Sequence, residues 1–113
     1  MSTAEKSEIL TLAEMVSYQD AAVVSRQITQ AEAGNVTLFA FDKGQGLSEH
    51  TAPFDALTHI LEGEAQVIIS GKPFYLKAGD AIIMPANEPH ALKAVQRFKM
   101  LLTMIRAQSN QRP

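Results

Sequence analysis

Three histidines are the side chains of this sequence whose types and spacing best suit chemistry. They are His50, His59 and His90, and the first and last stand in segments rich in glycine and proline. The chain has no cysteine, so it has no thiolate nucleophile, and a bound metal must be held by imidazole nitrogen or by oxygen. It also lacks a G-x-S-x-G sequence, a glycine-rich phosphate loop and a serine-histidine-aspartate arrangement. Acyl transfer and phosphoryl transfer are therefore excluded as leading hypotheses.

The composition is that of one ordinary folded domain. The chain has 113 residues, of which 46% are apolar and 19% charged, with a formal net charge of −2. A single domain of this length buries roughly two thirds of the surface of its unfolded chain. The proportions of apolar and charged residues also differ from those of disordered chains, which are less hydrophobic and more highly charged. Because the basic residues are scattered, the sequence predicts no nucleic acid partner.

Nothing in the sequence indicates membrane insertion or secretion. The first residues are polar and include Glu5 and Glu8, whereas a secretory signal has a basic start and a long apolar run. The longest apolar stretches, such as residues 81–86, are far shorter than the ~18 residues that span a bilayer. We expect no membrane partner and a cytoplasmic location.

The elements that must position the histidines are predicted to be short strands. Turn residues recur at even spacing, and the apolar residues between them alternate, as in residues 36–41 and 65–69. This pattern predicts an all-β sandwich or barrel. Residues 98–105 are apolar on both faces, which indicates a strand buried on both sides. Residues 9–15 are ambiguous, and we favour a strand or a coil with a turn over a helix.

The two glycine-rich segments resemble the paired motifs of the cupin family. In the first segment Gly44, His50 and Gly63 fall on the motif positions. In the second, Gly79, Pro85 and His90 do so, with Asn87 at a glycine position. Asn is a mild replacement there because it tolerates the left-handed backbone conformation. The resemblance covers about residues 34–105.

This resemblance implies a single cupin jelly-roll β-barrel. Residues 1–33 would form the N-terminal strands or arm, 34–106 the barrel, and 107–113 a flexible tail of the same domain. Residues 61–65 resemble the hairpin that the family places between the strands of its first motif.

The family's metal-ligand set is incomplete in this sequence. His50 and His90 remain, but Ala52 and Ala56 stand where metal-binding members have a histidine and a glutamate. Asp55 lies one residue from the glutamate position, so a regular strand would turn it outward, where it would cap nearby turn amides. A loop or bulge after Pro53 would instead aim it inward and complete a set of two histidines and one carboxylate that suits non-haem iron.

The remaining polar residues of this region are assigned by strand alternation. His59 is expected on the outer face, whereas Thr58 is expected inside the barrel, where its hydroxyl would bond a ligand. The methionines at 84, 100 and 104 are expected in the core.

Two main functions follow from the resemblance. The first is a cupin that binds a small molecule in its barrel, without turnover. The alternative is a metal-dependent enzyme, like a dioxygenase or an isomerase, that uses His50, His90 and Asp55 with a divalent metal such as iron, zinc, nickel or manganese. No organic cofactor is expected. A third reading, a barrel that serves as a subunit of another protein, has no sequence feature in its favour.

The outward apolar residues predict self-association. Sheet edges and outer faces of a small barrel need cover, and four large apolar residues face away from the predicted cavity. They are Leu57, Leu61, Leu101 and Ile105. We therefore expect a homodimer.

Overall fold

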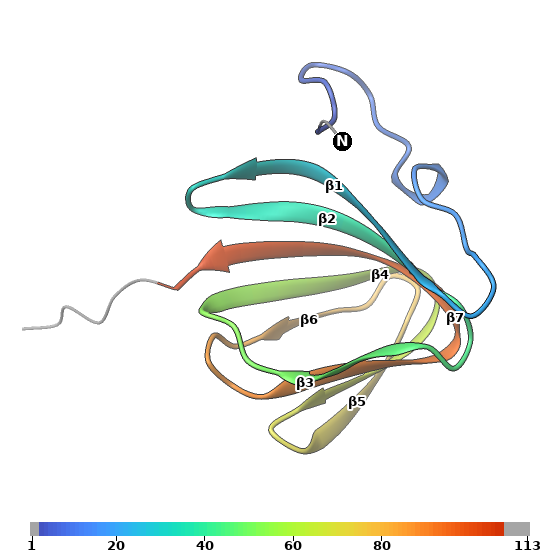
Figure 1. Cartoon of the computed structure of the whole chain (residues 1–113), viewed down its shortest axis with the longest axis vertical. Coiled ribbons are helices and arrows are strands. Elements are labelled where there is room, and N and C mark those ends of the chain that lie inside the picture. The colour runs from blue at the N-terminus through green and yellow to red at the C-terminus, as the bar shows by residue number, and fades with distance from the viewer. Residues whose placement is uncertain (1–2, 108–113) are drawn as a thin grey trace, which may run out of the picture.

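Two long antiparallel strands, β4 (Phe54–Ile69) and β7 (His90–Arg106), run side by side through the whole molecule (Figure 1). The computed structural model describes residues 3–107. Five shorter strands pair with the two long ones or with each other. They are β1 (Val23–Ala31), β2 (Gly34–Phe41), β3 (Gly46–His50), β5 (Lys72–Lys77) and β6 (Ala81–Met84).

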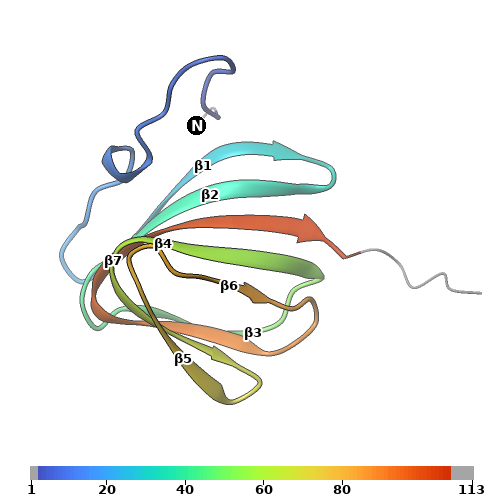
Figure 2. The same ribbon diagram turned by 180° about the vertical axis from the view of Figure 1, so that it is seen from behind.

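The long strands belong to two sheets at once. The first half of β4 and the second half of β7 lie in a sheet of order β1-β2-β7-β4-β6. Their other halves lie in a sheet of order β3-β7-β4-β5. The two sheets face each other, as both views show (Figures 1 and 2). The protein is therefore an all-β jelly-roll barrel, and the predicted fold class is confirmed.

The bend between the two sheets lies where a hairpin was predicted, and that prediction is wrong. Strand β4 continues through residues 61–65 with register shifts against β7 instead of reversing. Gly63 makes the bend possible because its φ is +84° and an added Cβ would lie 1.8 Å from the carbonyl oxygen of Arg97. The chain reverses later, at Ser70 and Gly71, which both have positive φ.

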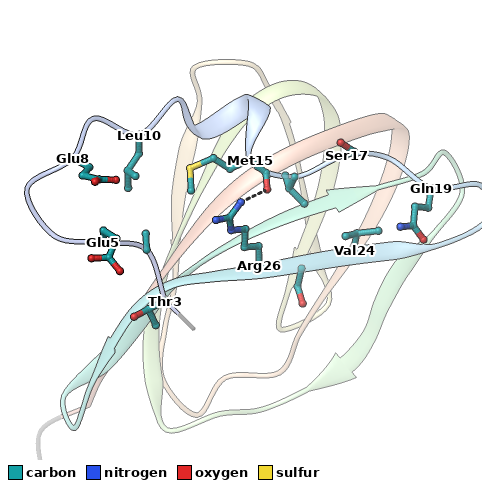
Figure 3. A pocket seen from close by; sticks show the side chains of 12 residues that line it. Thr3, Glu5, Glu8, Leu10, Met15, Ser17, Gln19, Val24 and Arg26 are labelled. Carbon is teal, nitrogen blue, oxygen red and sulfur yellow. Dashed lines mark hydrogen bonds between the residues drawn. The ribbon is translucent and has the colours of Figure 1, made fainter. Parts of the chain in front are cut away.

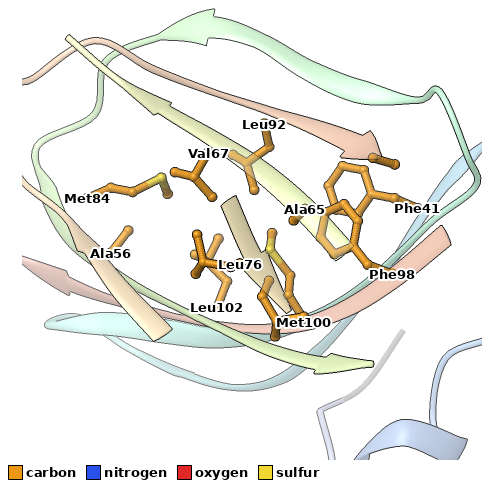
Figure 4. Packing of buried hydrophobic residues seen from close by; sticks show 12 residues of the cluster. Phe41, Ala56, Ala65, Val67, Leu76, Met84, Leu92, Phe98, Met100 and Leu102 are labelled. Atoms are coloured by element: carbon orange, nitrogen blue, oxygen red, sulfur yellow. The ribbon is translucent and has the colours of Figure 1, made fainter. Parts of the chain in front are cut away.

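Buried apolar side chains fill the space between the sheets (Figure 4). Phe41 and Phe98 stack with their ring centroids 4.3 Å apart, and Met84 and Met100 are buried in the same cluster. This agrees with the predicted core positions. Met104 is only partly buried, and it packs against the cluster from the second half of β7.

A second apolar cluster lies outside the barrel, beneath the N-terminal arm (residues 3–22). Leu38 and Ala40 of β2 point away from the interior yet are fully buried, because Val16 and other apolar residues of the arm cover them. Leu61 and Leu101, predicted as exposed outer residues, pack against this cluster too. The chain therefore covers part of its own outer sheet, and these two leucines are not open surface.

The arm is mostly coil, with a 3-10 turn over Leu12–Glu14. This fits the predicted coil with a turn better than a strand. No helix within residues 3–107 has the length and apolar character needed to cross a membrane. The predicted tail lies outside the described residues from position 108 on.

Candidate binding site

His50 and His90 are brought together at one end of the barrel. His50 ends β3, His90 begins β7, and the two residues are cross-strand partners. Their ring centroids lie 4.4 Å apart, and the ring planes cross at 69°, so one ring edge meets the other ring's face. The structure therefore brings these two side chains into contact.

A bulge in β3 turns His50 toward its partner. Leu47 packs against the barrel core opposite Leu92, so a regular strand would point Glu49 inward and His50 outward. The register shift between Leu47 and His50 inserts one extra residue and reverses this assignment. The local irregularity is what sets His50 opposite His90.

Both imidazoles have the same protonated nitrogen. Nδ1 of His50 lies 2.6 Å from the carbonyl oxygen of Ser48, and Nδ1 of His90 lies 3.1 Å from that of Glu88. A carbonyl oxygen only accepts hydrogen bonds, so each Nδ1 carries the proton and each Nε2 carries a lone pair in the neutral ring. The pair therefore presents two Nε2 acceptors to a ligand.

The two histidines differ in exposure. His90 is only 5% exposed, whereas His50 is open to solvent. Burial lowers the pKa of His90, the hydrogen bond to Glu88 raises it, and the neighbouring His50 lowers it further, with a net shift below the ordinary value. His90 is therefore neutral at pH 7.

The loop before His90 is fixed by the neighbouring turn. The Ser70 hydroxyl donates to the Glu88 carboxylate at 2.5 Å, and the Ser70 amide donates to the Pro89 carbonyl at 2.8 Å. Asn87 has φ +66°, the left-handed conformation expected for an Asn at a glycine position. These contacts hold the Glu88 carbonyl where it orients the His90 ring.

Asp55 is not brought to the histidines. Ala56 is buried in the core, so Asp55, the preceding residue of a regular stretch of β4, points outward. One of its carboxylate oxygens accepts a hydrogen bond from the Ala86 amide at 2.9 Å. Asp55 thus caps a loop, which is the outward role considered for it from the sequence.

Ala52 lies in the connection between β3 and β4, where its carbonyl accepts from the Asn87 amide at 2.8 Å. Neither Ala52 nor Ala56 has a side-chain donor for a metal. Within residues 3–107 no three His, Asp or Glu side chains converge to hold an ion. The two imidazoles alone do not fit a resident divalent metal, because such sites use three or more protein ligands.

Thr58 and His59 lie on opposite faces of β4, as predicted. Thr58 is fully buried, and its Oγ1 has no hydrogen-bond partner among the described residues. His59, with buried neighbours on both sides in the strand, projects from the outer face between Ala81 and Leu101. The interior thus holds one unbonded hydroxyl among apolar side chains.

Sequence reasoning missed the groups that orient the imidazoles. The Ser48 and Glu88 carbonyls each lie two residues before the histidine that they bind. Any residue type supplies a backbone carbonyl, so the sequence does not mark these groups. The two-residue separation between each carbonyl and its histidine can be recognised only once the loop conformations are known.

Fold and site together define a jelly-roll barrel with two adjacent imidazoles at one end. The model of the cupin domain matches residues 37–105, more than half of the chain. The chain therefore belongs to the cupin family. No curated protein matches it.

Several solved structures are similar to this chain. A conserved protein of unknown function from Streptococcus pyogenes is 35% identical over 96% of this chain and 98% of its own, with a TM-score of 0.87. A cupin superfamily protein from Desulfitobacterium hafniense is 29% identical over 92% of this chain and 95% of its own, with a TM-score of 0.84. A cupin 2 conserved barrel domain protein from Leptotrichia buccalis is 40% identical over 86% of this chain but 47% of its own, with a TM-score of 0.83.

Proposed function

We propose that this protein binds a small molecule at His50 and His90 and does not hold a resident metal. The observation that carries the proposal is the shared tautomer. Two backbone carbonyls occupy the Nδ1 protons, which leaves both Nε2 lone pairs for a ligand. Two Nε2 acceptors this close together select a ligand with N–H or O–H donors.

The surroundings favour a ligand with a substantial apolar part. The buried side chains between the sheets are almost all apolar, and methionines are prominent among them. Thioether side chains adapt their shape to a bound molecule more readily than branched ones do. A donor-bearing head at the histidines and an apolar body toward the core match this environment.

A fragment screen monitored by amide NMR tests the proposal. Fragments with N–H or O–H donors on an apolar ring are titrated into the parent protein and into His50→Gln, His90→Gln and His59→Gln. We expect binding to weaken about tenfold or more in the first two variants, because each loses one of the two imidazole acceptors that the ligand needs. The outward His59→Gln is the matched control and should bind as the parent does. Equal binding by all four proteins would overturn the proposal.

The alternative hypothesis, a metal-dependent enzyme, can be tested with the same protein variants. Stabilisation by a ligand requires a concentration well above its dissociation constant, so micromolar zinc, nickel, manganese or ferrous iron should barely change the melting temperature. A large rise in melting temperature with one metal, absent in His90→Gln, would overturn the binding proposal. It would indicate a metal site in which a further ligand joins His50 and His90.

We also propose that two copies associate through the part of the outer sheet that the arm leaves open. Leu57 and Ile83 are cross-strand partners on this face and are 39% and 59% exposed, and Ile105 is 59% exposed nearby. Strand β6, which carries Ile83, pairs with β4 on one side only, so its other edge is open. A second copy would cover the same residues on both partners.

Sedimentation tests this association. The parent should sediment as a dimer at micromolar concentration and Ile83→Glu as a monomer, whereas Tyr75→Glu, at a 70% exposed position on β5, should remain dimeric. A monomeric parent would refute the dimer.

A further inference from the structure

A cavity outside the barrel lies between the N-terminal arm and strand β1 (Figure 3). Its volume is about 620 Å³, within the range of small-molecule sites. It opens on the outer side of β1, whereas His90 faces the barrel interior on a different sheet. The two sites are therefore separate.

The arm is tied to the barrel on both sides of this cavity. At one end the Ala4 amide donates to the Ile28 carbonyl at 2.8 Å. At the other end Val16 is buried, and the Tyr18 hydroxyl donates to the Glu62 carboxylate at 2.7 Å. Lys99 adds a hydrogen bond from its ammonium to the Ala13 carbonyl. Between these ties the arm arches away from β1, so the cavity is framed by fixed points.

Arg26 stands in the middle of the cavity (Figure 3). Its side chain rises from β1, on the outer face, and its guanidinium makes one long hydrogen bond, 3.4 Å, to the Met15 carbonyl. No ion pair of Arg26 occurs among the described residues. A guanidinium has five N–H donors in a planar fork that matches a carboxylate. Most of the donors of this half-buried group therefore remain for a ligand.

The other walls carry charges of opposite sign and apolar surface. Glu5 and Glu8 line the cavity from the arm, on the same side of Arg26 in the close view (Figure 3). Leu10, Met15 and Val24 supply apolar contacts. The two carboxylates disfavour a purely anionic ligand, and the guanidinium disfavours a purely cationic one.

We propose that this cavity binds a small zwitterion of amino-acid or dipeptide size. The ligand's carboxylate pairs with Arg26, its ammonium faces Glu5 and Glu8, and an apolar side chain packs on Leu10 and Met15. Bidentate pairing of a guanidinium with a carboxylate supplies both strength and orientation.

The probe is the dipeptide leucyl-leucine, titrated into the full chain and followed by amide NMR. We expect shifts confined to the arm and β1, and binding that weakens as salt is raised. N-acetylated and C-amidated forms of the dipeptide should each bind about tenfold more weakly or worse, because each loses one charge-assisted contact. These two comparisons use the parent protein and do not depend on the folding of any variant.

Variants locate the site. Arg26→Met should lose binding about tenfold or more, whereas Arg106→Met, an exposed arginine near the end of β7, should bind as the parent does. Absence of binding at millimolar dipeptide would overturn the proposal. Equal affinity for the capped and free dipeptides, or unchanged binding by Arg26→Met, would also overturn it.

Discussion

The Thr58 hydroxyl is the one polar side-chain atom that the described residues bury without a hydrogen-bond partner. A buried hydroxyl without a partner costs about 1–3 kcal/mol relative to one that is bonded. Its cross-strand neighbours are Ile82 and Leu102, which have no side-chain hydrogen-bonding groups. The protein therefore carries a local destabilisation inside its barrel.

Replacing Thr58 with Val should stabilise the protein. The two side chains have nearly the same shape, so Thr58→Val removes the unbonded hydroxyl without leaving a cavity, and we expect the free energy of unfolding to rise by about 1 kcal/mol. Urea denaturation measures the change. Thr103→Val, at a half-buried position on β7, is the control and should change stability by less than about 0.5 kcal/mol. A Thr58→Val protein less stable than the parent would mean that the hydroxyl is bonded in solution.

His90 makes stability depend on pH in a defined direction. Its pKa is lowered in the folded protein, chiefly by burial, whereas in the unfolded chain it returns to about 6.5. The unfolded state therefore binds more protons at acidic pH. The stability contributed by the neutral ring is complete above the unfolded pKa, and it is lost as pH falls below that value toward the folded pKa.

We therefore expect the parent's free energy of unfolding to fall more steeply between about pH 7 and pH 5 than that of His90→Gln. Denaturation series over this range measure both slopes. His59→Gln, with a side chain on the outer face, should follow the parent. If the free energy of unfolding depended on pH equally in the parent and in His90→Gln, the dependence would not come from the lowered pKa of His90.

At the scale of elements, bulges determine which residues reach the site. The bulge in β3 turns His50 toward His90, and the register shifts around Gly63 carry β4 from one sheet to the other. Both features depend on residues that depart from regular strand pairing. The shape of the barrel therefore depends on a few backbone positions.

Gly63 and Gly71 form a matched pair for testing this dependence. Their φ angles are +84° and +82°, but an added Cβ at Gly63 meets the Arg97 carbonyl at 1.8 Å, while nothing lies within 4 Å of one at Gly71. Gly71→Ala should cost only the strain of the left-handed conformation, about 1 kcal/mol. Gly63→Ala must also displace β7 and should cost about 3 kcal/mol or more. Equal losses in urea denaturation would show that β4 does not approach β7 as closely as described.

At the scale of the whole molecule, the N-terminal arm completes the outer layer. Tyr18 lies under two cations, with Arg97 and Lys99 4.7 and 5.1 Å from its ring centre, and its hydroxyl bonds Glu62. Burial, followed by this hydrogen bond, raises the pKa of Tyr18. The tyrosine therefore remains protonated and keeps donating throughout the neutral and mildly alkaline range.

Val16 and Ile9 test the role of the arm. Val16 is 4% exposed in the outer cluster, whereas Ile9 is 98% exposed. Val16→Asp buries an unpaired carboxylate and should cost about 3 kcal/mol or more, with increased binding of a hydrophobic dye as Leu38 becomes accessible. Ile9→Asp should change stability by less than about 0.5 kcal/mol. A Val16→Asp protein as stable as the parent would show that the arm contributes little to the fold.

The sequence by itself determined the strand class, the inward positions of Thr58 and Ala56, the outward position of His59 and the left-handed Asn87. These follow from alternation and local backbone preference, which act over a few residues. The tertiary structure alone decided the bend at Gly63, the bulge in β3 before His50 and the covering of Leu61 and Leu101 by the arm. The first two need a partner strand to define the register, and the third needs contacts between segments far apart in the chain. Asp55 combines both kinds of information. Strand alternation predicts that its side chain points outward, but only the folded loop brings the Ala86 amide to its carboxylate.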